Sequence, residues 1–131
     1  MNRGSDWLAQ AARDLRHAEH AANVGDYYEW SCFAAQRAAE KAVKGVLLGL
    51  GGEGWGHSVL RLLERLATRM AVPESLFAAA RRLDRHYIPA RSPNGFPAGL
   101  PGEYYTAQDA EQAIADARAV VEFRQRAFPG S

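Results

Sequence analysis

The sequence predicts an all-α protein: a single-domain, up-and-down helical bundle of about five helices over residues 1–131. Apolar residues recur at intervals of three and four along most of the chain, and no segment alternates β-branched with polar residues as a strand does. The connections between most periodic segments are short, which favours antiparallel neighbours. A length of 131 residues fits one domain and leaves little room for a second.

Composition places the chain among ordinary globular proteins. Hydrophobic residues make up 47% and charged residues 24% of the sequence, which excludes an intrinsically disordered chain. The formal net charge is +1, from 16 Lys and Arg against 15 Asp and Glu. Net charge therefore gives no support for a protein that coats nucleic acid or an anionic membrane, although a local basic patch remains open.

Cysteine content and hydropathy bear on the compartment. The single cysteine, Cys32, excludes an intramolecular disulfide and a Cys-rich zinc site, and its place on an apolar face predicts a core position. No apolar run reaches the roughly 18 residues of a membrane span, and the N-terminus lacks the apolar core of a signal peptide. We therefore expect a cytoplasmic protein that does not engage a membrane.

The first helix is predicted from an apolar face that runs from Trp7 to Ala22 at spacings of four, four, three and four residues. Ser5 or Asp6 is expected to cap its start, and Gly25 to end it.

The second helix is predicted over residues 28–50, where apolar residues form a long stripe. Asp26 and Glu29 have the spacing of a capping box at its start, and the glycines that follow end it. Its alanine-rich centre indicates that a neighbouring helix approaches closely. The same small residues make this helix a candidate for a dimer interface.

Ser58 is expected to cap a third helix whose leucine-rich face reaches Met70. Pro73 is expected at the first position of a fourth helix whose apolar face reaches Tyr87. Residues 88–105 hold four of the six prolines and three glycines, so we expect an irregular segment, and such long loops are usually functional or mobile.

The last helix is expected to begin where Thr106 and Asp109 form a capping arrangement. It runs toward Phe128, and Pro129 is expected to end it.

Several polar residues outside the main motif have two interpretations. His17 and His20 are one turn apart without the further ligands a metal needs, so we expect neither a metal nor a cofactor. For Lys41 and Lys44 we favour solvent over a nucleotide phosphate. For His57 we favour packing or capping over an anion held at a helix N-terminus. The three tryptophans are expected in the core or at an interface: Trp7, Trp30 and Trp55.

An ordered set of segments resembles the HEPN domain family, in its branch of small stand-alone prokaryotic proteins. The resemblance covers residues 6–122. Its segments are WLAQAARDL at 7–15, FAAQRAAEKAVK at 33–44, GHS at 56–58, LDRHYIPAR at 83–91 and EYYTAQDA at 103–110.

This resemblance implies a bundle of four or five helices that is usually a homodimer. It also implies a minimal nucleotidyltransferase as partner, because small prokaryotic members are often encoded beside one and some such pairs are toxin–antitoxin systems. Active members are metal-independent ribonucleases with an arginine, four to six residues and a histidine. Other members lack that signature and bind nucleotides or partners.

Arg81 and His86 have the signature spacing and are the candidate catalytic residues. Arginine suits bidentate contact with phosphate, and histidine suits proton transfer near neutral pH. Five residues of ideal helix rotate by about 500°, which leaves the two side chains about 140° apart. The pair would need a bend in the helix, long side-chain reach or a site assembled across a dimer, whereas Arg82 shares a face with His86 more naturally.

The candidate nucleotide- or phosphate-binding residues surround this pair: Arg82, Arg85, Arg91 and Tyr104. Tyr104 and Tyr105 have two interpretations, stacking on a base or anchoring the loop. We expect a HEPN-type, nucleotide- or RNA-associated protein that works with a minimal nucleotidyltransferase and has no turnover in isolation. A metal-independent endoribonuclease toxin is the alternative, and a helical protein–protein scaffold is a lesser one.

Overall fold

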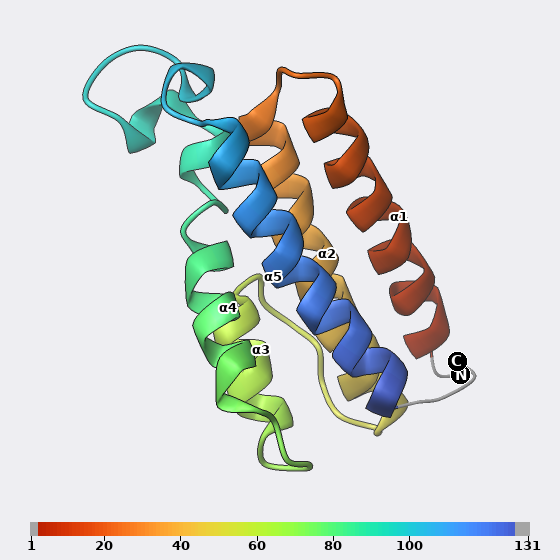
Figure 1. Ribbon diagram of the computed structural model, residues 1–131. Coiled ribbons are helices and arrows are strands. Elements are labelled where there is room, and N and C mark those ends of the chain that lie inside the picture. The colour runs from red at the N-terminus through yellow and green to blue at the C-terminus, as the bar shows by residue number, and fades with distance from the viewer. Residues whose placement is uncertain (1–2, 128–131) are drawn as a thin grey trace.

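The computed structural model describes residues 3–127 and shows five α-helices and three short 3-10 turns within them (Figure 1). The all-α prediction is therefore confirmed. The α-helices are α1 (Gly4–Asn23), α2 (Tyr28–Gly49), α3 (Val59–Leu66), α4 (Glu74–Asp84) and α5 (Ala107–Ala127). The 3-10 turns are η1 (Pro89–Arg91), η2 (Pro93–Gly95) and η3 (Pro101–Glu103).

Helix α2 is the centre of the bundle. It packs against α1 and α5 along its length and also contacts α3 and α4, and Figure 1 shows it between the other two long helices. Small residues allow this close packing, because a Cβ atom at Gly45 would come within 2.9 Å of the Gly4 carbonyl oxygen on α1. The alanine-rich face is buried as expected, and Cys32 is fully buried with it.

Two helix starts follow the sequence prediction. The Ser58 hydroxyl accepts a hydrogen bond from the Arg61 amide at 3.1 Å and caps α3. At the start of α5, the Thr106 amide donates to Asp109 at 2.9 Å while the Asp109 amide donates to the Thr106 hydroxyl at 3.2 Å. Each of these helix starts is set by hydrogen bonds between residues three apart, so local sequence is sufficient to identify it.

The predicted caps of the first two helices are wrong. Helix α1 begins at Gly4, and the carboxylate of Asp6 pairs with Arg3 at 3.1 Å instead of capping. Before α2, Tyr27 takes a left-handed conformation with φ of 59°, and its amide donates to Asp26. That turn uses the Asp26 carboxylate, so the expected capping box with Glu29 does not form.

The third and fourth helices are shorter than predicted. Helix α3 ends at Leu66 and Met70 follows in a turn, while Pro73 is the N-cap of α4 rather than its first residue. Helix α4 ends at Asp84, and residues 85–88 form turns with bonds between residues three apart. A helix is disfavoured immediately before a proline, and Pro89 follows this turn. His86 therefore lies beyond the ideal helix assumed for the 140° angle.

Residues 88–105 are irregular, as predicted, and protrude at one end of the bundle (Figure 1). The segment is tied to the helices through contacts of η1 and η3 with α2. Within it, Tyr104 stacks on Phe96 at a centroid distance of 4.2 Å and donates to the Ala98 carbonyl at 2.6 Å. Tyr104 therefore holds two parts of this segment together.

Two tryptophans depart from the expected core position, since Trp30 is 45% and Trp55 is 66% exposed. A role for them at an interface stays a prediction. None of the helices within residues 3–127 combines the length and the apolarity needed to cross a bilayer. Pro129, the expected end of the last helix, lies outside the described residues.

Candidate functional site

The end of α4 and the turn after it send their polar side chains in different directions. Arg82 points to α5, where its Nε and Nη2 atoms each lie 2.9 Å from an oxygen of Asp116. Arg81 is 55% exposed and lies 3.9 Å from Glu74. Within the described part of the chain, the contacts of Arg81 and those of His86 do not overlap.

His86 is half-buried beside the last helix. Its Nδ1 atom lies 3.0 Å from the hydroxyl of Tyr105. Burial lowers the pKa of His86 and raises the pKa of Tyr105, so a neutral imidazole faces a protonated phenol at neutral pH. When the phenol donates to Nδ1, the ring proton of His86 lies on Nε2.

On the opposite side of α4, Asp84 holds the start of α3. Its carboxylate accepts from the Val59 and Leu60 amides at 2.8 and 3.1 Å and from the Ser58 hydroxyl at 2.8 Å. Gln36, fully buried on α2, donates to the His57 carbonyl at 2.8 Å. These bonds fix the loop that carries His57 against α2.

Glu40 on α2 is a fully buried carboxylate with three cationic or titratable partners. Lys44 lies 2.8 Å from it, Arg37 2.9 Å and the His57 Nδ1 atom 3.3 Å. A buried carboxylate is tolerated only when it is paired and hydrogen-bonded. The expectation that Lys44 faces solvent is therefore wrong, and Lys41 is also only 16% exposed where it pairs with Asp14 at 2.7 Å.

A row of rings, exposed at Trp30 and His57 and half-buried between them, runs beside this buried network. The His57 ring stacks on Tyr87 at 5.1 Å, and Tyr87 lies 5.9 Å from Phe33, which in turn contacts Trp30 edge-on at 6.0 Å. The Arg91 guanidinium lies over Tyr87 at 4.6 Å. Packing is thus confirmed for His57, and its ring also lies at the molecular surface.

The structure divides the residues predicted from sequence among four places. Arg82 and His86 face α5, Arg91 covers Tyr87, Tyr104 packs within the protruding segment, and Arg81 and Arg85 are exposed to solvent. Sequence reasoning missed the Glu40 network, although the spacings of three and four between the charged residues on α2 were available as a signal.

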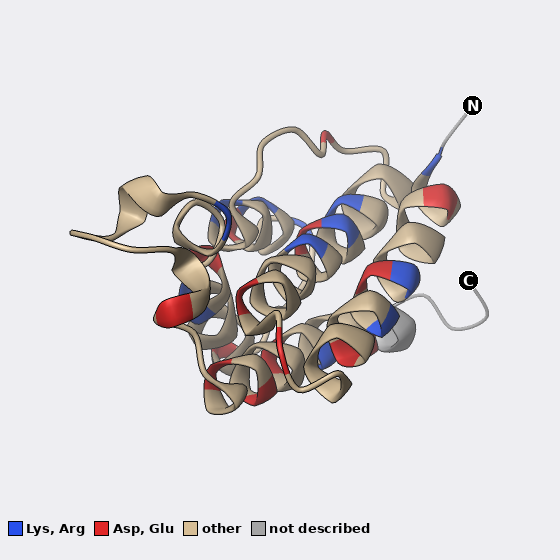
Figure 2. Ribbon diagram, turned by 90° about the horizontal axis from the view of Figure 1, so that it is seen from above, with Lys and Arg blue, Asp and Glu red and all other residues tan. Residues whose placement is uncertain are grey.

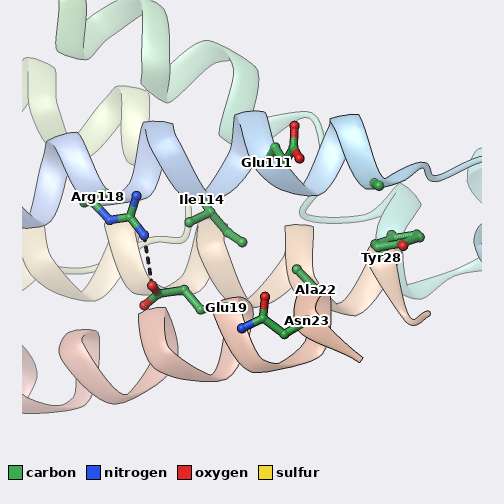
Figure 3. Close-up of a pocket in the computed structure, with 8 residues that line it drawn as sticks. Glu19, Ala22, Asn23, Tyr28, Glu111, Ile114 and Arg118 are labelled. Atoms are coloured by element: carbon green, nitrogen blue, oxygen red, sulfur yellow. Dashed lines mark hydrogen bonds and ion pairs between the residues drawn. The ribbon is translucent and has the colours of Figure 1, made fainter. Parts of the chain in front are cut away.

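A cavity of about 400 Å³ lies where the end of α1 meets α5 (Figure 3). Glu19 and Arg118 pair at 2.9 Å along its wall, and Glu111 adds a second acid. Two acids against one arginine make this cavity unsuited to a phosphate. Nowhere within residues 3–127 do three His, Cys, Asp or Glu side chains gather as a metal site requires.

Positively and negatively charged residues are interspersed over the described helices. Figure 2 shows Lys and Arg segments beside Asp and Glu segments on neighbouring helices, in agreement with the net charge of +1. A site for an anion must therefore come from particular arginines that keep N–H donors not bonded to a carboxylate.

The comparison with known families decides the relationship. The family model for the HEPN domain matches residues 5–127. The chain belongs to the HEPN domain family. This small HEPN protein thus has the five-helix fold that the resemblance implied.

Solved structures agree with this assignment. TT1696 from Thermus thermophilus is 48% identical, with a TM-score of 0.92 over 96% of this chain and 98% of its own. ST0689, described as an archaeal HEPN homologue, is 40% identical with a TM-score of 0.82 over 97% and 98%. A Methanocaldococcus jannaschii protein named "Putative toxin MJ1304" is 29% identical over an aligned length of 125 residues, and the match covers 88% of this chain and 82% of that protein.

Proposed function

We propose that this HEPN protein binds a nucleotide or RNA at the arginine-rich end of α4 and the segment that follows, without turnover by the isolated chain. The unmatched charge of the arginines there carries the proposal. Within the described residues, Arg85 and Arg91 have no carboxylate at ion-pair distance, and the Glu74 partner of Arg81 is 3.9 Å away. Arginines without acidic partners suit phosphate oxygens.

The arrangement favours binding over catalysis in a single protomer. Arg82, which shares a helix face with His86, has its Nε and Nη2 donors on Asp116. Arg81 contacts Glu74 in solvent, on its own. A phosphate at His86 therefore lacks an arginine already aimed at it.

The partners in this proposal follow from the family resemblance. A minimal nucleotidyltransferase is the proposed partner, with this chain as the toxin half of a toxin–antitoxin pair, and a homodimer is the proposed assembly. The name of the Methanocaldococcus relative supports the toxin role. The exposed Trp30 and the surrounding aromatic residues offer an apolar surface for such contacts.

A metal-independent endoribonuclease is the second candidate, and the environment of His86 favours it. A histidine whose pKa is lowered by burial is neutral at pH 7. It is able to take the proton of an RNA 2′-hydroxyl at Nε2 in the tautomer whose Nδ1 carries the ring proton and donates it to the Tyr105 hydroxyl. Arg81 would then stabilise the phosphorane. A second protomer or a movement of the Arg81 side chain would have to complete this site.

The decisive experiment measures binding and cleavage of the same single-stranded RNA in EDTA. We expect the wild type to bind a labelled RNA in anisotropy titrations, and Arg85→Gln to weaken binding about threefold to tenfold through loss of one phosphate contact. Arg118→Gln, which removes the same charge from the acidic cavity, is the control. Equal binding by Arg85→Gln and wild type would contradict the proposed surface.

Cleavage assays separate the two candidates. Cleavage by the wild type but not by His86→Ala would establish the ribonuclease and place its site. No cleavage by either, together with saturable binding, supports the binding function. Equal cleavage by both would indicate a contaminant or another site.

A further inference from the structure

We propose that Arg37 and His57 form a phosphate-binding site on the α2 side of the bundle, and that Trp30 and Phe33 receive the base of the same nucleotide. This inference rests on the proposed binding of a nucleotide or RNA. It places the phosphate beside α2 rather than at the Arg81–His86 pair that the sequence pattern indicates.

Arg37 has the edge of its guanidinium available. Its three contacts all use Nη1, which lies 2.9 and 3.1 Å from the two Glu40 oxygens and 3.2 Å from the His57 Nδ1 atom. Its Nε and Nη2 atoms have no partner among the described residues, and the side chain is 27% exposed. Nε and Nη2 form the parallel pair of donors that binds two phosphate oxygens. Arg82 already uses this pair on Asp116.

The local charge around Arg37 is net positive, because two cations share one buried carboxylate. Lys44, itself buried, lies 2.8 Å from Glu40 and balances that carboxylate. The Asp84 carboxylate is held by two amides and a hydroxyl at the start of α3. Arg37 and Lys44 therefore share one carboxylate, which leaves one positive charge in excess, and Glu40 fixes the position of Arg37.

His57 supplies a second donor next to Arg37. Its Nδ1 atom lies between the Arg37 Nη1 atom and the Glu40 carboxylate, so Nε2 is directed away from the buried network. The side chain is 57% exposed. When Arg37 donates to Nδ1, the proton of the neutral ring is on Nε2, and protonated His57 carries a proton there as well. A phosphate therefore selects states in which Arg37 and His57 both donate.

The aromatic part of the site adjoins Arg37. A cavity of about 260 Å³ is lined by Trp30, Phe33 and Arg37, and Trp30 is 45% exposed. Phe33 and Arg37 are one turn apart on the same face of α2. Asp14 also lines this cavity and pairs with Lys41 at 2.7 Å, and His57 lies next to Arg37, with its Nδ1 atom 3.2 Å from Nη1. We therefore place the phosphate of a base packed on these rings toward His57, away from the Asp14 carboxylate. Stacking on aromatic side chains is tolerant of base identity.

The test uses the full chain with two probes, adenosine monophosphate and a labelled single-stranded RNA of ten nucleotides. We expect Arg37→Gln and Trp30→Ala each to weaken binding about tenfold. Arg118→Gln, which removes an arginine from the exposed ion pair between α5 and Glu19 of α1, should leave binding within about twofold. Dependence of both probes on these residues indicates a free nucleotide as ligand, and dependence of the RNA alone indicates an RNA chain.

The outcomes separate this inference from the proposed function. If the wild type binds neither probe, both are overturned. If Arg85→Gln weakens RNA binding while Arg37→Gln and Trp30→Ala do not, the proposed function stands and this site is overturned. An equal loss with Arg118→Gln overturns the site as well, because the effect is then one of overall charge. Since Arg37 contacts a buried acid, the melting temperature of its variant is checked, and if that variant does not fold the exposed Trp30→Ala variant decides.

Discussion

Two buried carboxylates, Glu40 on α2 and Asp116 on α5, are each paired with an arginine, yet the two pairs differ in what they leave available. Asp116 takes Nε and Nη2 of Arg82 at 2.9 Å each and also accepts from Gln112 at 3.1 Å. Glu40 takes one nitrogen of Arg37 together with Lys44. Asp116 occupies both the Nε and the Nη2 donors of Arg82, and we call this pair closed. Glu40 contacts only Nη1 of Arg37 and leaves Nε and Nη2 without a partner among the described residues, and we call this pair open.

This difference changes which arginine is suited to a ligand. Spacing in the sequence favours Arg82, because it is four residues before His86. Geometry favours Arg37, because a buried acid orients it without using its Nε and Nη2 donors. The number of engaged nitrogens, rather than distance from a motif, therefore distinguishes a structural arginine from one that is available to phosphate.

The largest effect is expected from Glu40→Gln. Lys44 is 7% exposed and would be left as a buried cation without a counter-ion, which costs about 3–5 kcal/mol of folding free energy. Urea unfolding measures the loss. Glu64→Gln, in an exposed pair with Arg61, is the control and should change stability by less than about 0.5 kcal/mol. A loss below about 1 kcal/mol for Glu40→Gln would show that Lys44 does not need Glu40 as a counter-ion.

An intermediate effect is expected from Asp84→Ala. The change removes the acceptor for two α3 amides and for the Ser58 hydroxyl, and we expect a loss of about 2 kcal/mol. Thermal unfolding followed by circular dichroism measures it. Ser58→Ala, which removes the local cap and one donor to Asp84 but keeps both amide bonds to Asp84, should cost about 1 kcal/mol. A larger loss with Ser58→Ala than with Asp84→Ala would mean that α3 is held by its own cap.

A smaller effect is expected from Asp116→Asn. Arg82 is 43% exposed, so it stays hydrated when the carboxylate is removed, and we expect a loss of about 1 kcal/mol. The same urea titration allows direct comparison with Glu40→Gln. Equal losses of folding free energy for Glu40→Gln and Asp116→Asn would contradict the distinction between the closed Arg82–Asp116 pair and the open Arg37–Glu40 pair.

The smallest effect concerns pH. Because burial lowers the pKa of His86 in the folded chain, the unfolded chain binds a proton first as pH falls below about 6.5. Stability contributed by neutral His86 is therefore complete above that pH and declines below it. As the pH is lowered from 8 to 5, the free energy of unfolding should fall more steeply for the wild type than for His86→Gln. Parallel profiles would show that His86 titrates alike in both states.

The fold was largely predictable from the sequence because most of its signals are local. Apolar spacing identified five helices, and the caps by Ser58 and by Thr106 with Asp109 were found from residues three apart. The ends of α3 and α4 were not, because an apolar residue packs equally well from a turn as from a helix. Met70 still packs against the core beyond the last residue of α3.

The candidate site was predictable only in part. The signature spacing predicted Arg81 and His86 as the catalytic pair, with Arg82 as a phosphate-binding residue. The partners of Arg82 and His86 are 34 and 19 residues away in the chain, on or just before α5. Such contacts depend on how helices pack. The position of Lys44 shows the same limit, because its neighbours on α2 suggest a solvated face.

The sequence by itself determined the helices, the family and which side chains have the chemistry to contact phosphate or transfer a proton. Only the tertiary structure decided which of those residues are buried, which carboxylate each arginine meets and which nitrogens remain available. The physical reason is that the strength of a charge interaction depends on the exclusion of water. Exclusion of water is a property of packed helices, as the burial of Glu40 beneath Arg37 and His57 shows.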